Sequence, residues 1–163
     1  MTALDIAAAA LERAAVLDHR LTITDATIRA WTDCFEDHSI WTEEAVKAVS
    51  EHYSQPSPFP IMPGDVIDRV AQMDLNPKSS QERIDWTIDF WAERPYTSGL
   101  VLATGVEFHL PVEPDAVRLK GSWAAHDWHR DWLRHWVAEN REKLVAAIRS
   151  GQAKYGTPRH EGW

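Results

Sequence analysis

The stretch Trp41-Thr-Glu-Glu-Ala-Val46, followed by Phe59-Pro-Ile-Met-Pro-Gly-Asp-Val66, decides the fold of the first half of the chain. Thr42 is a favoured helix N-cap, and the two glutamates after it suit the positive end of a helix dipole. Prolines at alternate positions before Ile61 force an extended turn. The pattern predicts helices over 42–54 and 63–73, with Trp41 and Val46 packed across the start of the first.

Two more helices are expected upstream, over 3–17 and about 25–37. An alanine-rich run favours the first helix, whose inward side is expected to hold Leu4, Ala8, Leu11 and Ala15. Three- and four-residue spacing on the second helix gives one apolar stripe, formed by Ile28, Trp31, Cys34 and Phe35. The sequence therefore predicts an acidic N-terminal four-helix bundle over residues 1–75 that buries Trp31 and Trp41.

This combination of aromatics and prolines resembles the N-terminal domain of phage replisome organisers, the family of the loader and inhibitor of the phage replicative helicase. The resemblance covers roughly residues 4–75 and is carried by Trp31, Phe35, His52-Tyr53, the Phe59-Pro-Ile61 turn and Pro63-Gly-Asp-Val-Ile67. It implies a helical head and a more flexible tail. It also implies a non-enzymatic task, in which the protein binds a replicative helicase or an origin-binding protein.

The second half, residues 76–163, begins within a polar segment over 74–80 that is typical of a linker. A short helix is expected over 82–91. Two apolar runs on either side of Gly105 predict a small β-hairpin over 100–110, and one helical turn is expected over 115–119. A long helix is predicted from Ser122 to Ser150, capped by Ser122. The expected fold class is therefore mainly α.

Charge is distributed unevenly along the chain, which carries −8 at pH 7. Residues 1–80 contain 6 Lys+Arg and 13 Asp+Glu, whereas residues 117–163 contain 9 and 5. DNA phosphates repel the acidic half, so the basic end is the segment whose charge favours nucleic acid. A solvated surface that binds no nucleic acid explains the same asymmetry.

The long C-terminal helix carries an aromatic stripe bordered by arginines. The candidate contacts with a partner or with nucleic acid are Trp128, Trp132, Trp136, Arg130, Arg134 and Arg141. Aromatic rings beside arginines can stack on bases and hold phosphates, which makes single-stranded DNA a second expected partner through the C-terminal region. The same side chains can instead dock the helix onto the rest of the domain, with the arginines at the rim.

Motifs for catalysis are lacking. His126 and His129 lie one helical turn apart and could share a metal ion, but no third ligand follows at a matching spacing. The sequence contains no His-Glu-x-x-His and no Gly-x-Ser-x-Gly motif. Its single cysteine, Cys34, excludes an internal disulfide and a cysteine-based zinc site. We therefore expect no catalytic residue, no cofactor and no bound metal.

The composition predicts a folded protein, because 44% of the residues are hydrophobic and nine are tryptophans. No apolar run approaches the length of a membrane span, and the N-terminus lacks the pattern of a secretory signal. A single cysteine fits a reducing compartment. The sequence thus predicts a soluble protein without membrane contact, in the cytoplasm of a bacterial host cell.

Three functions remain open. The preferred one is a non-enzymatic adaptor of phage or prophage DNA replication that is similar to a helicase loader. The second is a helix-turn-helix DNA-binding regulator that uses helices 42–54 and 63–73. Against it, Asp65 and Asp68 outnumber Arg69 on the helix that would enter the groove. The third is a small metal enzyme built around His126 and His129.

Overall fold

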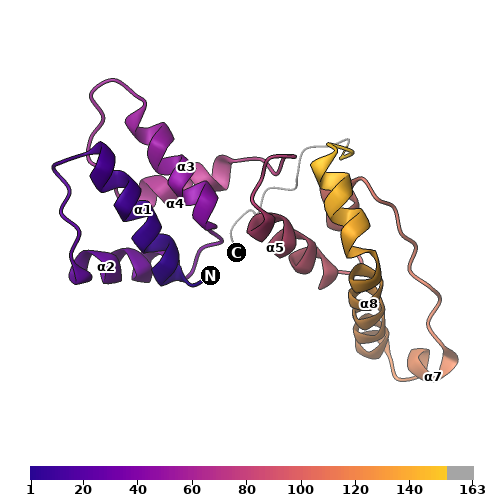
Figure 1. The fold of residues 1–163 in the computed structure, drawn as a ribbon. Helices are drawn as coiled ribbons and strands as arrows, with labels where there is room; N and C mark the ends of the chain where they lie inside the picture. Colours follow the sequence, from indigo (N-terminus) through magenta and orange to yellow (C-terminus); the bar gives the residue numbers. More distant parts are fainter. Residues whose placement is uncertain (154–163) are drawn as a thin grey trace. The chain divides into compact units, whose positions relative to one another are not determined.

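The computed structural model describes residues 1–153, which form eight helices and no strand. The expectation of a mainly α fold is confirmed. Contacts divide the chain into two compact units (Figure 1): unit 1 spans Met1–Met73, and unit 2 begins at Asp74. Each unit therefore has to be understood from its own packing.

Unit 1 consists of four helices joined by short loops. They are α1 (Ala3–Leu17), α2 (Asp25–Phe35), α3 (Thr42–Tyr53) and α4 (Pro63–Gln72). Helix α1 packs against α2 and α3, and α4 also packs against α2 and α3. These bounds lie within two residues of those expected from the sequence, so the caps and prolines located the helices well.

Helix starts in unit 1 follow from local hydrogen bonds. At α1, the Thr2 hydroxyl accepts from the Asp5 amide at 3.3 Å, while the Asp5 carboxylate accepts from the Thr2 amide at 2.9 Å. At α3 the expected cap was wrong by one residue. Trp41 has the extended backbone of an N-cap, and Thr42 is the first helical residue.

The core of unit 1 is built around tryptophan, as expected. Trp31 is 6% exposed and Trp41 is 5% exposed, and Phe35 meets Trp31 edge-on with 5.9 Å between ring centroids. The placement of Cys34 on the buried face was wrong, because its side chain is exposed. Trp31 and Phe35, four residues apart, define the buried line of α2, and Cys34 falls to one side of it.

The expected inward face of α1 was also largely wrong. Its buried residues are Ile6, Ala7, Ala10, Leu11 and Ala14, so only Leu11 was placed correctly. Leu4 is 50% exposed. A run of four alanines carries no hydrophobic contrast, so the periodicity in this segment could not distinguish one helix face from its neighbour.

A polar network fastens the loop after α1 to the loop after α3. Arg20 Nε donates to the buried carboxylate of Asp18 at 2.7 Å, and the Tyr53 hydroxyl donates to it at 3.0 Å. Tyr53 in turn accepts from the Ile61 amide at 3.0 Å. The Arg20 hydrogen bond holds the pKa of Asp18 well below its usual range. This contribution to stability is therefore present at neutral pH and is lost as the pH falls below about 4.

Unit 2 is organised around one long helix. Its helices are α5 (Gln81–Ala92), α6 (Gly99–Thr104), α7 (Asp115–Arg118) and α8 (Ser122–Arg149). Helices α5, α6 and α7 each pack against α8. The buried core of unit 2 contains Ile84, Ile88, Leu100, Val106, Leu133, Val137, Leu144 and Ile148. Gly121, rather than the expected Ser122, takes the N-cap position of α8.

The expected β-hairpin over 100–110 was wrong. Residues Gly99–Thr104 form α6, in which Leu100, Ala103 and Thr104 are buried at helical spacing. Gly105 supplies a positive φ of 72°, as expected for a turn, but it ends a helix instead of joining two strands. The apolar run was too short for its periodicity to separate a helix from a strand.

Residues 105–114, which we call the strap, link α6 to α7 in an extended conformation (Figure 1). Val106 is buried in the core of unit 2. Phe108 packs against Trp136 of α8, with 5.4 Å between ring centroids. The strap therefore covers part of α8 without belonging to a sheet.

Within residues 1–153, none of the helices combines the length and the apolar character that crossing a membrane requires. The longest, α8, has 28 residues. Charged side chains recur along it, Arg130, Arg134 and Arg141 among them. This helix is therefore built to pack on one side and to meet solvent on the other.

Replacing Trp31 by alanine should lower the free energy of unfolding of unit 1 by about 3–5 kcal/mol, because a buried aromatic leaves a cavity. Trp123, which is 82% exposed, provides the matched control, and its replacement should change stability by less than about 0.5 kcal/mol. Chemical denaturation followed by circular dichroism measures both. A loss below about 1 kcal/mol for Trp31→Ala would show that this side chain does not hold the bundle together.

Candidate functional site

The arginines expected to contact a partner are engaged within unit 2. Arg134 forms a two-pronged ion pair with Glu93, at 2.6 and 2.5 Å, and lowers the pKa of that carboxyl. Arg141 binds Asp85 at 2.7 Å and also pairs with Asp89. Both arginines thus connect α8 to α5 or to its C-terminal end.

Arg149 makes a similar connection from α8 to the segment before α5, although the sequence analysis did not identify it as a candidate. Its guanidinium donates to the Pro77 carbonyl at 3.0 Å and to the Ser79 carbonyl at 2.5 Å, just before α5 begins. Arg134, Arg141 and Arg149 lie about two turns apart along α8, and we call them the arginine ladder. The ladder fixes how α5 lies along α8, and its cations are already matched by carboxylates and carbonyls.

Arg130 lies outside the arginine ladder, and its contacts are with residues of α8 itself. Its guanidinium lies 3.3 Å from Asp127 and 3.7 Å from Asp131, both on α8 itself. Its Nε is buried and has no hydrogen-bond partner among the described residues. Contacts of this kind on a helix surface contribute about 0–1 kcal/mol. Arg130 is therefore the least firmly engaged of the three arginines singled out from the sequence.

The tryptophan stripe of α8 mostly faces inward. Trp132 and Trp136 pack against the core of unit 2 and stack on each other, with 6.5 Å between ring centroids. Trp128 is half-buried and meets His129 edge-on at 5.1 Å. The structure thus favours docking over ligand contact for Trp132 and Trp136, which was one of the two alternatives left open by the sequence.

His129 fastens the strap to α8. Its side chain is buried, and Nε2 lies 2.9 Å from the carbonyl oxygen of Pro111, which can only accept a hydrogen bond. Nε2 therefore carries a proton, and Nδ1 is left to bond the Tyr96 hydroxyl at 3.0 Å. The two ring nitrogens thus have partners, and neither is open to a metal ion. No group of three or more His, Cys, Asp or Glu within residues 1–153 is placed to hold one.

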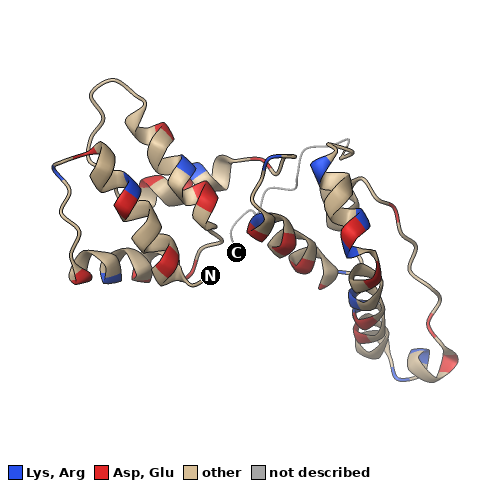
Figure 2. Cartoon of the chain, in the orientation of Figure 1, with Lys and Arg blue, Asp and Glu red and all other residues tan. Residues whose placement is uncertain are grey.

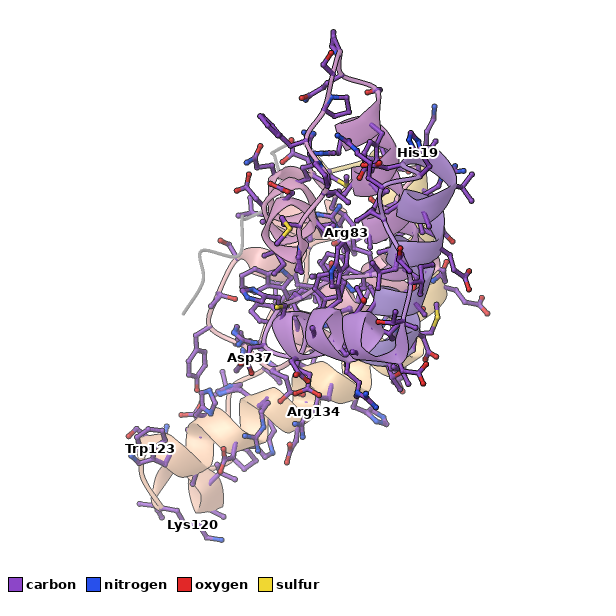
Figure 3. All side chains as sticks on the ribbon, turned by 90° about the vertical axis from the view of Figure 1, so that its left-hand side faces the viewer. His19, Asp37, Arg83, Lys120, Trp123 and Arg134 are labelled. Atoms are coloured by element: carbon purple, nitrogen blue, oxygen red, sulfur yellow. The ribbon has the colours of Figure 1, made fainter. Side chains whose placement is uncertain are left out.

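Sequence reasoning missed the most exposed apolar side chains of unit 2. Val112, Leu119 and Trp123 are 83%, 86% and 82% exposed, and they lie on the strap, just after α7 and at the start of α8. We call this group the α7 end. Figure 3 shows Trp123 and Lys120 projecting from the N-terminal end of α8. One signal was available, since Trp123 lies about 140° around the helix from Trp128 and so falls outside the buried stripe.

The α7 end has the character of a contact surface. Its three apolar side chains are carried by the strap, by the residue after α7 and by α8, and tryptophan is one of the residues enriched among binding hot spots. Arg118 is paired with Asp115, whereas Lys120 is exposed and has no ion-pair partner among the described residues. Exposed apolar side chains of this kind suit a protein partner that offers apolar side chains of its own.

Replacing His129 by alanine should cost unit 2 about 1–3 kcal/mol, since the Pro111 carbonyl and the Tyr96 hydroxyl lose their shared partner. His135→Ala is the control on the same helix, because the His135 side chain is 79% exposed and pairs only with Glu139. Denaturant titration of the full chain compares the two variants. Equal losses would show that His129 does not hold the strap.

Comparison with known proteins gives no further guide to the site. No protein-family model, no curated protein sequence and no solved structure matches this chain. The function therefore has to be inferred from the residues of the chain and from their arrangement.

Proposed function

We propose that the chain is a non-enzymatic adaptor of phage or prophage DNA replication. In this proposal it binds a replicative helicase, or an origin-binding protein, in the cytoplasm of a bacterial host. The observation that carries the proposal is the α7 end, where Val112, Leu119 and Trp123 are each more than four-fifths exposed on a folded unit. Such a surface is costly to leave in water unless a partner covers it.

The resemblance of unit 1 to phage replisome organisers supports the same function. It rests on Trp31, Phe35 and the Pro63-Gly-Asp-Val-Ile67 helix start. Residues 1–73 contain 5 Lys+Arg and 12 Asp+Glu, and Figure 2 shows the positions of Asp and Glu, in red, distributed over the helices of unit 1. An acidic unit favours basic protein surfaces and opposes DNA phosphates, which fits an adaptor better than a DNA reader.

A helix-turn-helix regulator is less favoured by the geometry of unit 1. That motif joins its two helices by a turn of about three or four residues. The connection between α3 and α4 is residues 54–62, and the other two connections are 18–24 and 36–41. All three are longer than the motif allows.

Single-stranded DNA is likewise the weaker candidate partner for unit 2. A phosphate contact needs cations that are free to release their counterions. Arg134 and Arg141 would first have to give up their contacts with Glu93, Asp85 and Asp89. The geometry thus offers DNA few ready cations, whereas it offers a protein partner an apolar surface.

The test is to titrate the chain into the purified replicative helicase of the bacterial host and to measure the dissociation constant by calorimetry. Trp123→Ala should weaken binding by about ten- to thirtyfold, the usual cost of removing an aromatic hot spot. Val16→Ala is the control, because Val16 is an apolar side chain that is 78% exposed on α1 and is not among the residues that carry the resemblance. Its affinity should stay within about twofold of that of the unchanged chain.

Two outcomes would contradict the proposal. One is that helicase and origin-binding protein both fail to bind the chain. The other is tight binding to a single-stranded oligonucleotide, steeply weakened by salt, without binding to either protein. The second result would show that the C-terminal region binds single-stranded DNA instead.

A further inference from the structure

The strap has the side-chain pattern of a β-strand that has no neighbour. Val106 is buried, Phe108 and Leu110 are half-buried, and Glu107 and His109 between them are exposed. Alternation with a period of two is the pattern of a strand with one face on a core and the other in water. Unit 2 covers the inward face of the strap. This packing does not supply hydrogen-bond partners for the backbone groups along the edges of the strap.

The backbone of the strap is largely without partners. Backbone–backbone hydrogen bonds of the described residues include none from or to residues 106–113. The Val106 amide donates to the Thr104 hydroxyl at 3.1 Å, and the Pro111 carbonyl accepts from His129. From Glu107 to Leu110, four consecutive residues leave both amide and carbonyl without a partner within residues 1–153. An extended segment in this state is a template for pairing with another strand.

We propose that the strap pairs with the strap of a second copy of this chain, forming a two-stranded antiparallel ribbon across a two-fold axis at Phe108. The paired residues, 106–110, include none of the three side chains of the α7 end, although Val112 follows two residues later on the strap. The pairing does not depend on the proposed helicase contact. Pairing supplies partners for the alternate residues whose amide and carbonyl groups point to the shared edge, and the two-fold symmetry of the contact gives a dimer.

The side chains of the strap select this register. Residues directly opposite in an antiparallel pair point to the same face, so inward residues must meet inward residues. An axis at Phe108 places Glu107 opposite His109 of the second copy, twice over. An axis at Glu107 or at His109 places two like side chains opposite each other. Opposite charges facing across a pair stabilise it, whereas like charges destabilise it.

The Glu–His pairing does not require a charged imidazole. A neutral imidazole still carries one N–H, which can donate to a carboxylate, and a protonated one carries two. Both Glu107 and His109 are exposed, and neither has an ion pair among the described residues. The outward face of the strap is therefore self-complementary in charge and in hydrogen bonding.

This self-complementarity favours pairing with a second copy of the chain over pairing with an unrelated strand. In the paired form the inward side chains of both strands point to one side, so both α8 helices lie beneath the same ribbon. Phe108 of each copy remains on its own Trp136, since the pairing uses only backbone edges and outward side chains.

Charge variants test the proposal by sedimentation equilibrium over a wide range of protein concentration. The unchanged full chain should show a monomer–dimer equilibrium. His109→Glu places carboxylates opposite each other twice and should raise the dimer dissociation constant by about tenfold. Adding Glu107→Lys to that variant restores two opposite-charge pairs and should return the constant to near its original value.

Cysteine variants test the register in a Cys34→Ser background, since Cys34 is exposed. Chains carrying Glu107→Cys, mixed with chains carrying His109→Cys, should form a disulfide with each other faster than with themselves. Faster self-crosslinking of either variant would overturn the register centred on Phe108. Hydrogen exchange at 107–110 should also be slower at concentrations where the dimer forms.

Trp123→Ala separates this interface from the α7 end and should leave the monomer–dimer equilibrium unchanged. A chain that stays monomeric at every concentration overturns the proposal. So does a dimer that His109→Glu leaves intact, or one that Trp123→Ala abolishes. Circular dichroism of each variant shows that the helices are retained, so a lost dimer is not mistaken for a lost fold.

Discussion

Burial of one face of α8 is the constraint on which unit 2 depends. Six aliphatic side chains from α5 and α8 (Ile84, Ile88, Leu133, Val137, Leu144 and Ile148) are at most 3% exposed. Each contributes roughly 1.5–3 kcal/mol when removed from water. The ion pairs beside them are half-exposed and contribute about 0–1 kcal/mol each. Apolar burial therefore holds the helices together, while the arginine ladder fixes how they are aligned.

Because apolar burial and ion pairs have these separate roles, the arginines of α8, considered without the rest of unit 2, wrongly suggest a contact with nucleic acid. In the sequence, arginines beside tryptophans look available to phosphates. In the folded unit, Arg134 and Arg141 meet carboxylates that α5 and its C-terminal end bring alongside. The same aromatic and cationic residues thus pack within unit 2, whereas the highly exposed apolar residues of the α7 end lie outside the stripe.

The features that could be predicted from the sequence were mostly those that depend on residues close together in the chain. Helix positions in unit 1 followed from caps and prolines, and burial of Trp31 and Trp41 followed from spacing. The α6 segment was mistaken for a strand because Gly105 can turn either a hairpin or a helix end. The partners of Arg134 and Arg141 could not be predicted, since Glu93 and Asp85 lie more than 40 residues away in the chain. Exposure of Trp123 could have been found from its angle on the helix.

The length of α8 has a consequence for local unfolding. The first core residue on α8 is Leu133, beside which Trp132 packs, and the arginine ladder begins at Arg134. The preceding residues of α8, Ser122 to Asp131, therefore extend about 15 Å beyond that support. They are held instead by α7, by the strap and by the contacts of His129. Opening this end would break few apolar contacts and would leave the α5–α8 core folded. The segment bearing Trp123 can therefore adapt its shape to a surface while the remainder of the unit stays rigid.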